Sequence, residues 1–235
     1  MAISVPSDIS FFVSVHIPKT AGTTLGTILN RCCKYRLLMD YPGYDGNEYF
    51  TADPLIAKNR DFIAGYYKGI HGHFNVCRHQ SVFPEAKFVA MLRHPVDRLI
   101  SQYMHELNDP TDSMWHKYLT SGERTIVDMA EHRVLRRAMA QHLEGRPIED
   151  YDLLMLSENM GMSLMLLQHT IGNLHIGTHF GEPPQIPREN MGNKRQRSVV
   201  IDDKTKSAIY DRLTEDIELY KKASELFTKK ARKYL

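Results

Sequence analysis

A short segment rich in lysine, threonine and glycine is the part of the sequence best suited to hold an anion. Residues 16–24 read His-Ile-Pro-Lys-Thr-Ala-Gly-Thr-Thr and join an apolar, β-rich run to a helical pattern. A strand, a tight turn and a helix in this order direct backbone N–H groups and the helix dipole toward one point. Lysine adds a point charge, threonines add hydroxyl donors, and glycine lets the backbone approach closely. The residues expected to contact a phosphate group are Lys19, Thr20, Ala21, Gly22, Thr23 and Thr24.

This segment differs from the Walker A phosphate loop in the position of its lysine. Walker A places the lysine directly after the second of two glycines, whereas Lys19 precedes Gly22, the only glycine of the turn. The segment also lacks a Walker-type arrangement for Mg²⁺. Two alternatives therefore stay open: an ordinary strand–turn–helix with a surface lysine, and a P-loop-like nucleotide or nucleoside kinase.

The wording Ile-Pro-Lys-Thr-Ala-Gly-Thr-Thr resembles the 5′-phosphosulfate-binding loop of sulfotransferases, which use 3′-phosphoadenosine-5′-phosphosulfate (PAPS). It is especially similar to the loop of carbohydrate O-sulfotransferases, among them the heparan sulfate 2-O-sulfotransferase group. The resemblance implies an arginine at a second strand end, with a serine about eight residues later, to hold the 3′-phosphate of PAPS. Arg93 and Ser101 match this element, and arginine offers a phosphate a rigid fork of donors. Arg98, between them, is expected on the helix surface or in a structural ion pair.

A cluster of histidines occupies residues 71–79, which read His-Gly-His-Phe-Asn-Val-Cys-Arg-His. One interpretation is a zinc-stabilised binding module built on His71, His73, Cys77 and His79, although the spacing matches no common zinc signature. The resemblance implies another: uronyl 2-O-sulfotransferases carry a similar Gly-His-x-x-aromatic stretch, and His73 matches their catalytic base. An imidazole suits this role, because the acceptor hydroxyl must lose its proton as it attacks sulfur. His71 and His16 are expected to support the site or to pack within the fold, and no metal is expected to be required.

A basic segment precedes the last predicted helix. Residues 188–206 include six basic and three acidic residues, a pattern typical of a solvated loop. Sulfotransferases similar to this chain close a basic loop over the nucleotide at this point. The resemblance therefore implies that Lys194 and Arg195 contact the 3′-phosphate of PAPS or the acceptor. Glu158, after another predicted strand, is expected to cap a helix rather than to face the acceptor.

Alternating strands and helices must position these residues. Short apolar runs bounded by turn residues predict buried strands at residues 11–17, 68–73, 87–93 and 151–157. Apolar stripes and end signals predict helices at residues 23–31, 95–107, 124–144 and 159–169 and from Asp202 onward. Residues 40–60 and 172–200 are expected to be mostly loop. The pattern favours an α/β, P-loop-like three-layer fold with a central parallel sheet flanked by helices.

Length, charge and cysteine content limit the class of protein. A chain of 235 residues is long enough for one well-buried domain, and we predict a single domain over residues 1–235. A formal net charge of +2 argues against a nucleic-acid partner. Cys32, Cys33 and Cys77 cannot form a disulfide framework and fit a reducing compartment. We predict no signal peptide and no membrane span, and expect a soluble protein in the cytoplasm.

The motifs and the resemblance together predict a PAPS-dependent O-sulfotransferase. It would transfer a sulfuryl group from PAPS to a hydroxyl of a small-molecule or saccharide acceptor, with Lys19 and His73 as catalytic residues. The saccharide is implied by the resemblance alone, and the sequence does not indicate which acceptor is used. The kinase and the zinc-stabilised module remain the alternatives.

Overall fold

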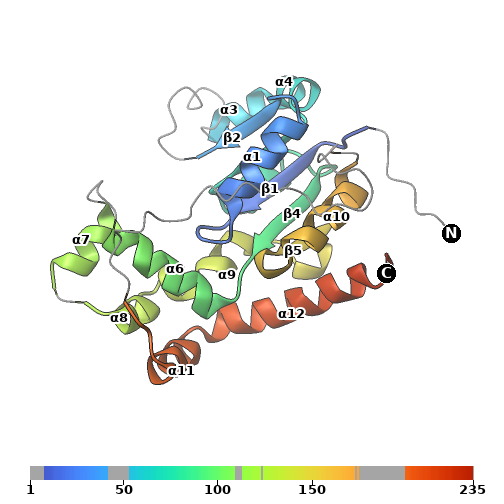
Figure 1. Cartoon of the computed structure of the whole chain (residues 1–235). Helices are drawn as coiled ribbons and strands as arrows, with labels where there is room; N and C mark the ends of the chain where they lie inside the picture. Colours follow the sequence, from blue (N-terminus) through green and yellow to red (C-terminus); the bar gives the residue numbers. More distant parts are fainter. Residues whose placement is uncertain are drawn as a thin grey trace.

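Five short apolar runs form one parallel sheet in the computed structural model, which describes residues 8–41, 53–108, 113–122, 124–172, 174 and 199–234. The strands are β1 (Phe12–His16), β2 (Leu37–Asp40), β3 (Gly69–Gly72), β4 (Lys87–Leu92) and β5 (Leu153–Leu156). Their order in the sheet is β2-β3-β1-β4-β5, and every neighbouring pair is parallel. Helices flank the sheet (Figure 1), which confirms the predicted three-layer α/β fold.

The central strands are buried along nearly their whole length. β1 reads Phe-Val-Ser-Val-His and β4 reads Lys-Phe-Val-Ala-Met-Leu, and only the first residue of β4 is partly exposed. Such continuous burial is typical of parallel strands that helices cover on both faces. Because β1 pairs with β3 on one side and β4 on the other, the carboxyl ends of these three strands lie side by side. Open α/β sheets bind their ligands at this edge.

Three of the described helices contribute apolar faces to the main hydrophobic core around the sheet. They are α1 (Gly22–Cys32), α10 (Met160–Ile171) and α12 (Thr214–Ala231). α10 and α12 both contact β5, and the apolar faces of all three helices belong to the main hydrophobic core. The sheet and these helices therefore form the rigid part of the molecule on which the loops at the strand ends rest.

A second hydrophobic cluster lies beside the sheet. It is built from α6 (Pro95–Leu107), α7 (Met114–Thr120), α8 (Ile126–Glu131) and α11 (Asp203–Arg212). The long helix α12 connects the two clusters, because its Ile217 belongs to the second and its Phe227 to the main core. Figure 1 shows α12 running from the neighbourhood of α11 along the lower side of the sheet.

The remaining elements are short, and several differ from the prediction. They are α3 (Asp53–Lys58), α4 (Arg60–Tyr66), α5 (Cys77–Gln80), α9 (Ala138–Leu143) and the 3₁₀ turns η1 (Leu135–Arg137), η2 (Ile148–Asp150) and η3 (Ser157–Asn159). The helix predicted at residues 124–144 is broken into α8, η1 and α9, and β2 has no counterpart in the prediction. The helix predicted from Asp202 onward is interrupted at Leu213, although Asp202 caps α11 as expected, accepting a hydrogen bond from Thr205 N at 2.7 Å.

Arg98 of α6 is buried, so its predicted position on the helix surface is wrong. It is 1% exposed, and its Nη2 donates a hydrogen bond to the carbonyl of Leu135 at 3.0 Å. Burial lowers the pKa of Arg98 to about 10, an effect that the carboxylate of Asp216 opposes. Asp216 is itself fully buried and accepts hydrogen bonds from the backbone N–H groups of Met139 and Ala140. These polar groups join α6, α9 and α12.

The Cys32, Cys33 and Cys77 side chains are free thiols. None of the described helices is long and apolar enough to cross a membrane.

Removing the Asp216 carboxylate should destabilise the fold strongly. Asp216→Ala leaves the buried Arg98 without a compensating charge and two backbone N–H groups without their acceptor, at a cost of about 3–5 kcal/mol in the free energy of unfolding. Denaturant unfolding measures this loss. The control is Asp203→Ala, since the Asp203 side chain is 99% exposed and its removal should change stability by less than about 0.5 kcal/mol. Equal losses in the two variants would contradict the structural role of Asp216.

Candidate active site

The turn between β1 and α1 has a strained and tightly held backbone. Lys19 (φ 69°) and Ala21 (φ 66°) both adopt the left-handed conformation, which costs a residue other than glycine roughly 1–2 kcal/mol. Thr20, between them, is fully buried, and its hydroxyl donates a hydrogen bond to the carbonyl of Ile17 at 2.8 Å. The Thr20 hydroxyl hydrogen is therefore used inside the turn, where it stabilises the loop conformation.

The first turn of α1 is open to an anion. Ala21 is the N-cap residue, and its side chain makes no capping hydrogen bond. The first N–H groups of an α-helix have no acceptor within the helix, and those of Gly22, Thr23 and Thr24 have no backbone acceptor among the described residues. The helix dipole favours negative charge at the same place. Thr23 is exposed and Thr24 partly exposed, so both hydroxyls lie where the sequence predicted donors.

Two glycines of α1 make room for histidine rings from the sheet. A Cβ atom at Gly22 would lie 1.7 Å from Cδ2 of His16, and one at Gly26 would lie 3.0 Å from the ring of His71. His16 is 5% exposed and His71 is fully buried. Gly22 is therefore needed for the close approach of the helix to the sheet as well as for the phosphate loop.

Lys19 and Arg93 meet at the ends of β1 and β4. Arg93 follows β4, and its Nη1 donates a hydrogen bond to the carbonyl of Lys19 at 3.3 Å. Burial and the charge of Arg93 lower the pKa of Lys19, whereas the carboxylate of Glu106 raises it. Within the described parts of the chain, no carboxylate lies within ion-pair distance of Lys19 or Arg93. Two cationic side chains thus lie at the same edge of the sheet, with no ion-pair partner among the described residues.

The other predicted donor contacts are less closely defined. Ser101 lies in the second turn of α6, partly exposed. No hydrogen bond joins it to the phosphate loop in the described parts of the chain. Lys194 and Arg195 lie outside the described residues, so their predicted role stays a prediction.

Three histidine rings and a tyrosine ring gather beside the phosphate loop. The ring centroids of His16 and His71 are 5.1 Å apart in a stacked arrangement, and those of His16 and His73 are 4.1 Å apart. The ring of Tyr41, the residue after β2, stands edge-on to His73 at 4.8 Å, and its hydroxyl lies 2.6 Å from Nδ1 of His16. The strand order β2-β3-β1 brings these four residues together from three strand ends.

His71 is held in one neutral form by two hydrogen bonds. Its Nε2 lies 3.2 Å from the carbonyl oxygen of Gly22, which can only accept, so Nε2 carries the proton. Nδ1 then accepts from the hydroxyl of Ser14 at 2.9 Å. Complete burial lowers the pKa of His71 to about 4. Since both ring nitrogens are occupied, His71 supports the structure of the site and has no free position to act as a base.

His73 carries its ring proton on the other nitrogen from His71. Its Nδ1 lies 2.6 Å from the backbone carbonyl of His16, so this nitrogen carries the proton. In the neutral ring, Nε2 then holds a lone pair, and it has no hydrogen-bond partner in the described parts of the chain. Burial lowers the pKa of His73, which keeps the ring neutral near pH 7. The side chain is partly exposed. His73 can therefore accept a proton from a bound molecule.

The residues considered as zinc ligands form hydrogen bonds with separate groups. His79 is fully buried, with Nε2 2.8 Å from Oδ2 of Asp40. Cys77 is exposed, and its Sγ lies 3.4 Å from the carbonyl of Glu144. Both nitrogens of His71 are occupied as described above. In the described parts of the chain no three His, Cys, Asp or Glu side chains gather as a metal site would require.

Glu158 caps a helix as expected, but the helix is α6, which precedes it in the sequence, rather than the helix that follows Glu158. Its Oε1 accepts the backbone N–H of His94 at 2.6 Å, and His94 is the N-cap residue of α6. The carboxylate thus links the end of β5 to the start of the helix that follows β4. It helps to position the segment that carries Arg93.

Sequence reasoning missed Tyr41 and Glu106 as neighbours of the site. Glu106 is 4% exposed and accepts hydrogen bonds from Gln102 and from Ser113 at 2.6 Å. Its charge acts on Lys19 from the far end of α6. The available signal for Glu106 was its position in the predicted helix, three residues after Tyr103 and seven after Leu99, which places it beside the apolar stripe. For Tyr41, the signal was its place directly after the short apolar run that forms β2.

The comparisons with known proteins identify a family. The protein-family model described as "Sulfotransferase family" matches residues 20–154, more than half of the chain. The match begins in the phosphate loop and includes the histidine cluster, Arg93 and Ser101. A search of the curated proteins finds no match. The extent of the family match and the arrangement of loop, arginine and histidine lead to one conclusion: the chain belongs to the sulfotransferase family, whose members transfer sulfuryl groups.

Proposed function

We propose that this sulfotransferase transfers the sulfuryl group of PAPS to a hydroxyl of a small-molecule or saccharide acceptor. One observation carries the proposal: a histidine whose basic nitrogen has no hydrogen-bond partner among the described residues lies beside the uncapped start of α1. The phosphate loop follows β1, His73 follows the neighbouring strand β3, and Arg93 follows β4 on the other side. Donor and acceptor can therefore meet at one edge of the sheet.

The residues of the loop fit the 5′-phosphosulfate of PAPS. The uncapped first turn of α1 offers backbone N–H groups, and Lys19 has no carboxylate partner in the described residues. Arg93, and Ser101 on α6, would bind the 3′-phosphate, and we assign Lys194 and Arg195 to the 3′-phosphate or the acceptor. PAPS supplies an activated sulfuryl group to such a site. The contribution of Lys19 is to stabilise the negative charge that grows on the 5′-phosphate oxygen as the S–O bond breaks.

His73 would act on the acceptor. As the acceptor oxygen forms its bond to sulfur, its proton passes to Nε2 of His73, while the carbonyl of His16 holds the proton on Nδ1. The bonding electrons of the broken S–O bond leave with the 5′-phosphate, which gives adenosine 3′,5′-bisphosphate as the second product. The charges balance, because the proton gained by histidine matches the negative charge on the leaving group. Positioning and electrostatics, rather than a covalent intermediate on the protein, would provide the rate enhancement, as in phosphoryl transfer.

The choice of a saccharide acceptor rests on the sequence resemblance. The sequence of the phosphate loop and the Gly72-His73 pair resemble the corresponding sequences of carbohydrate O-sulfotransferases. A screen of sugars, glycosides and simple alcohols as acceptors, with PAPS as donor and product masses as the readout, tests this choice.

Replacing His73 should remove turnover and spare nucleotide binding. His73→Ala lacks the base, and we expect the turnover number to fall by roughly 10²- to 10⁴-fold. Sulfation assays measure this loss, and calorimetry with adenosine 3′,5′-bisphosphate should give an unchanged affinity. His105→Ala is the matched control, because His105 is exposed on α6 and should retain normal rates. Lost nucleotide binding with unchanged chemistry would refute the assignment.

The pH dependence provides a separate test. His73 must be neutral to accept a proton, and burial lowers its pKa from the usual 6.5. The rate should therefore rise with pH through a midpoint below 6.5 and stay level above it. This acidic limb should be missing from the residual activity of His73→Ala. A limb centred above 6.5, or one that survives the substitution, would point to another base.

Arg93 and Ser101 should distinguish nucleotides by their 3′-phosphate. A charge-assisted hydrogen bond to a phosphate contributes about 1.5–3 kcal/mol, so Arg93→Ala should weaken adenosine 3′,5′-bisphosphate at least tenfold and spare adenosine 5′-phosphosulfate. Arg93 also donates a hydrogen bond to the carbonyl of Lys19, so its removal could disturb the phosphate loop. Ser101→Ala is therefore measured as a second variant, and it should show the same selectivity between the two nucleotides with a smaller loss of affinity. Calorimetric titration gives both affinities. Equal losses for the two nucleotides would argue against a 3′-phosphate contact.

A further inference from the structure

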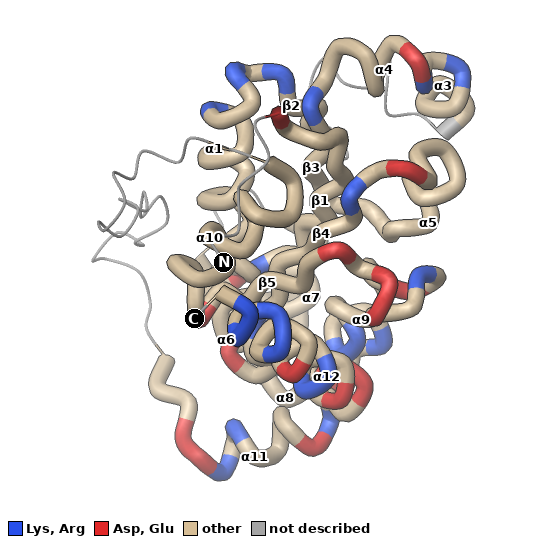
Figure 2. Tube along the Cα trace, turned by 90° about the vertical axis from the view of Figure 1, so that its right-hand side faces the viewer, with Lys and Arg blue, Asp and Glu red and all other residues tan. Residues whose placement is uncertain are grey.

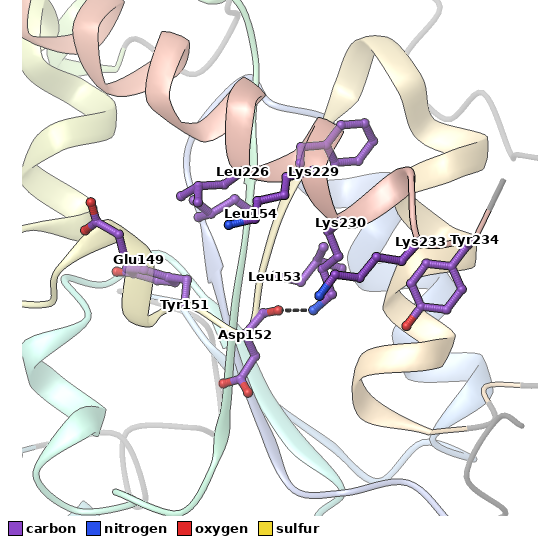
Figure 3. A pocket seen from close by; sticks show the side chains of 11 residues that line it. Glu149, Tyr151, Asp152, Leu153, Leu154, Leu226, Lys229, Lys230, Lys233 and Tyr234 are labelled. Atoms are coloured by element: carbon purple, nitrogen blue, oxygen red, sulfur yellow. Dashed lines mark hydrogen bonds between the residues drawn. The ribbon is translucent and has the colours of Figure 1, made fainter. Parts of the chain in front are cut away.

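A cavity lies at the end of the sheet opposite the candidate active site. It has a volume of about 270 Å³ and is enclosed by the chain just before and at the start of β5 and by the last turns of α12. Leu153 and Leu154 are the first residues of β5, so the cavity adjoins the amino end of a strand whose carboxyl end faces the site. Figure 3 shows the side chains that surround it.

Part of the cavity wall is apolar and rigid. Leu153, Leu154 and Phe227 are each at most 5% exposed and belong to the main hydrophobic core. Tyr151 is also buried, and its hydroxyl donates a hydrogen bond to the carbonyl of Leu143 at 3.3 Å. Leu226 and Tyr234 also line the cavity and are partly exposed, so the surface open to a hydrocarbon group is mainly theirs.

The opposite wall is formed by lysines. Lys229, Lys230 and Lys233 come from the last turn of α12 and the residues just after it. Figure 2 shows this end of the helix as a basic stretch, and in Figure 3 Lys230 and Lys233 extend toward Asp152. Lys230 donates a hydrogen bond to the backbone carbonyl of Asp152. Burial lowers the pKa of Lys230, the charge of Asp152 opposes this effect, and the charges of Lys87 and Lys233 add to it.

The two carboxylates at the cavity form their hydrogen bonds and ion pairs with other groups. Asp152 binds Lys87 through Oδ1 and the backbone N–H of Phe88 through Oδ2, both at 2.9 Å. Glu149 forms an ion pair with Lys222. In the described parts of the chain, Lys229 and Lys233 have no ion-pair partner. Positive charge therefore remains beside an apolar wall, an environment that an anion would stabilise.

We propose that this cavity binds a small organic anion, with its aromatic or aliphatic body against Leu226, Phe227 and Tyr234 and its carboxylate, phosphate or sulfate group on Lys229, Lys230 and Lys233. Neither the phosphate loop nor the histidine cluster contributes to it, because these lie at the other end of the parallel strands. The site is therefore distinct from the one that we assign to PAPS and the acceptor.

The test uses 2-naphthoate as the probe and the full chain as the protein. Calorimetry should show binding of one 2-naphthoate per chain. The neutral 2-naphthol and inorganic sulfate should each bind at least tenfold more weakly, because one lacks the charge and the other the apolar body. Titration with 2-naphthyl sulfate and 2-naphthyl phosphate then ranks the anionic groups. Equal affinity for 2-naphthoate and 2-naphthol would overturn the proposal.

Variants locate the binding site. The double substitution Lys229→Gln/Lys233→Gln should lower the affinity for 2-naphthoate at least tenfold. Lys206→Gln/Lys221→Gln removes the same charge from exposed positions away from the cavity and should leave the affinity within twofold. Circular dichroism confirms that both variants are folded, which is expected because all four lysines are exposed. If the two double variants bind equally well, the proposal is wrong.

A competition experiment separates the cavity from the active site. Saturating adenosine 3′,5′-bisphosphate should leave the affinity for 2-naphthoate unchanged, and amide NMR signals of Leu153 and Leu154 should shift on addition of the probe. Displacement of the probe by the nucleotide, or shifts confined to the phosphate loop, would show that 2-naphthoate binds at the active site instead.

Discussion

The hydrogen bond between Nδ1 of His73 and the backbone carbonyl of His16 connects the two halves of the proposed chemistry. His16 ends β1, which leads into the phosphate loop, and His73 directly follows β3. A backbone carbonyl cannot rotate away or change its protonation state, so it fixes the tautomer of His73 more reliably than another side chain would. The pairing of β1 with β3 in parallel register sets this geometry. The basic nitrogen thus depends on the sheet itself.

The packing of α1 on the sheet supports the same arrangement. Gly22 and Gly26 let the helix approach His16 and His71 closely, and the carbonyl of Gly22 then accepts the Nε2 proton of His71. Gly22 therefore contributes to the phosphate loop, to the packing of α1 on the sheet and to the orientation of the buried His71. The strained conformations of Lys19 and Ala21 are maintained because the surrounding contacts leave the loop little freedom.

The sequence was a good guide to the elements and a poorer guide to how they meet. The strand-to-helix pattern around residues 16–24 and 93–101 predicted the fold, because apolar runs and the turn residues that bound them act locally. The role of His71 could not be read in this way, since it depends on Ser14 and Gly22, which are distant in sequence. The burial of Arg98 was missed for the same reason: its partners lie on η1 and α12. Short elements such as β2 gave too weak a periodic signal to be recognised.

The position of β1 in the middle of the sheet has a consequence for folding. β1 is the first strand in the sequence, yet both its neighbours, β3 and β4, are made later, and the sheet is complete only when β5 follows. During synthesis β1 therefore has no neighbouring strand to pair with until more than fifty further residues have been added. Parallel pairing across such separations is slow because loop closure costs entropy before contacts form. The Thr20 hydrogen bond in the turn after β1 needs no distant partner, but the left-handed conformations of Lys19 and Ala21 are supported by contacts such as that of Arg93, so the phosphate loop is complete only after β4 has paired with β1.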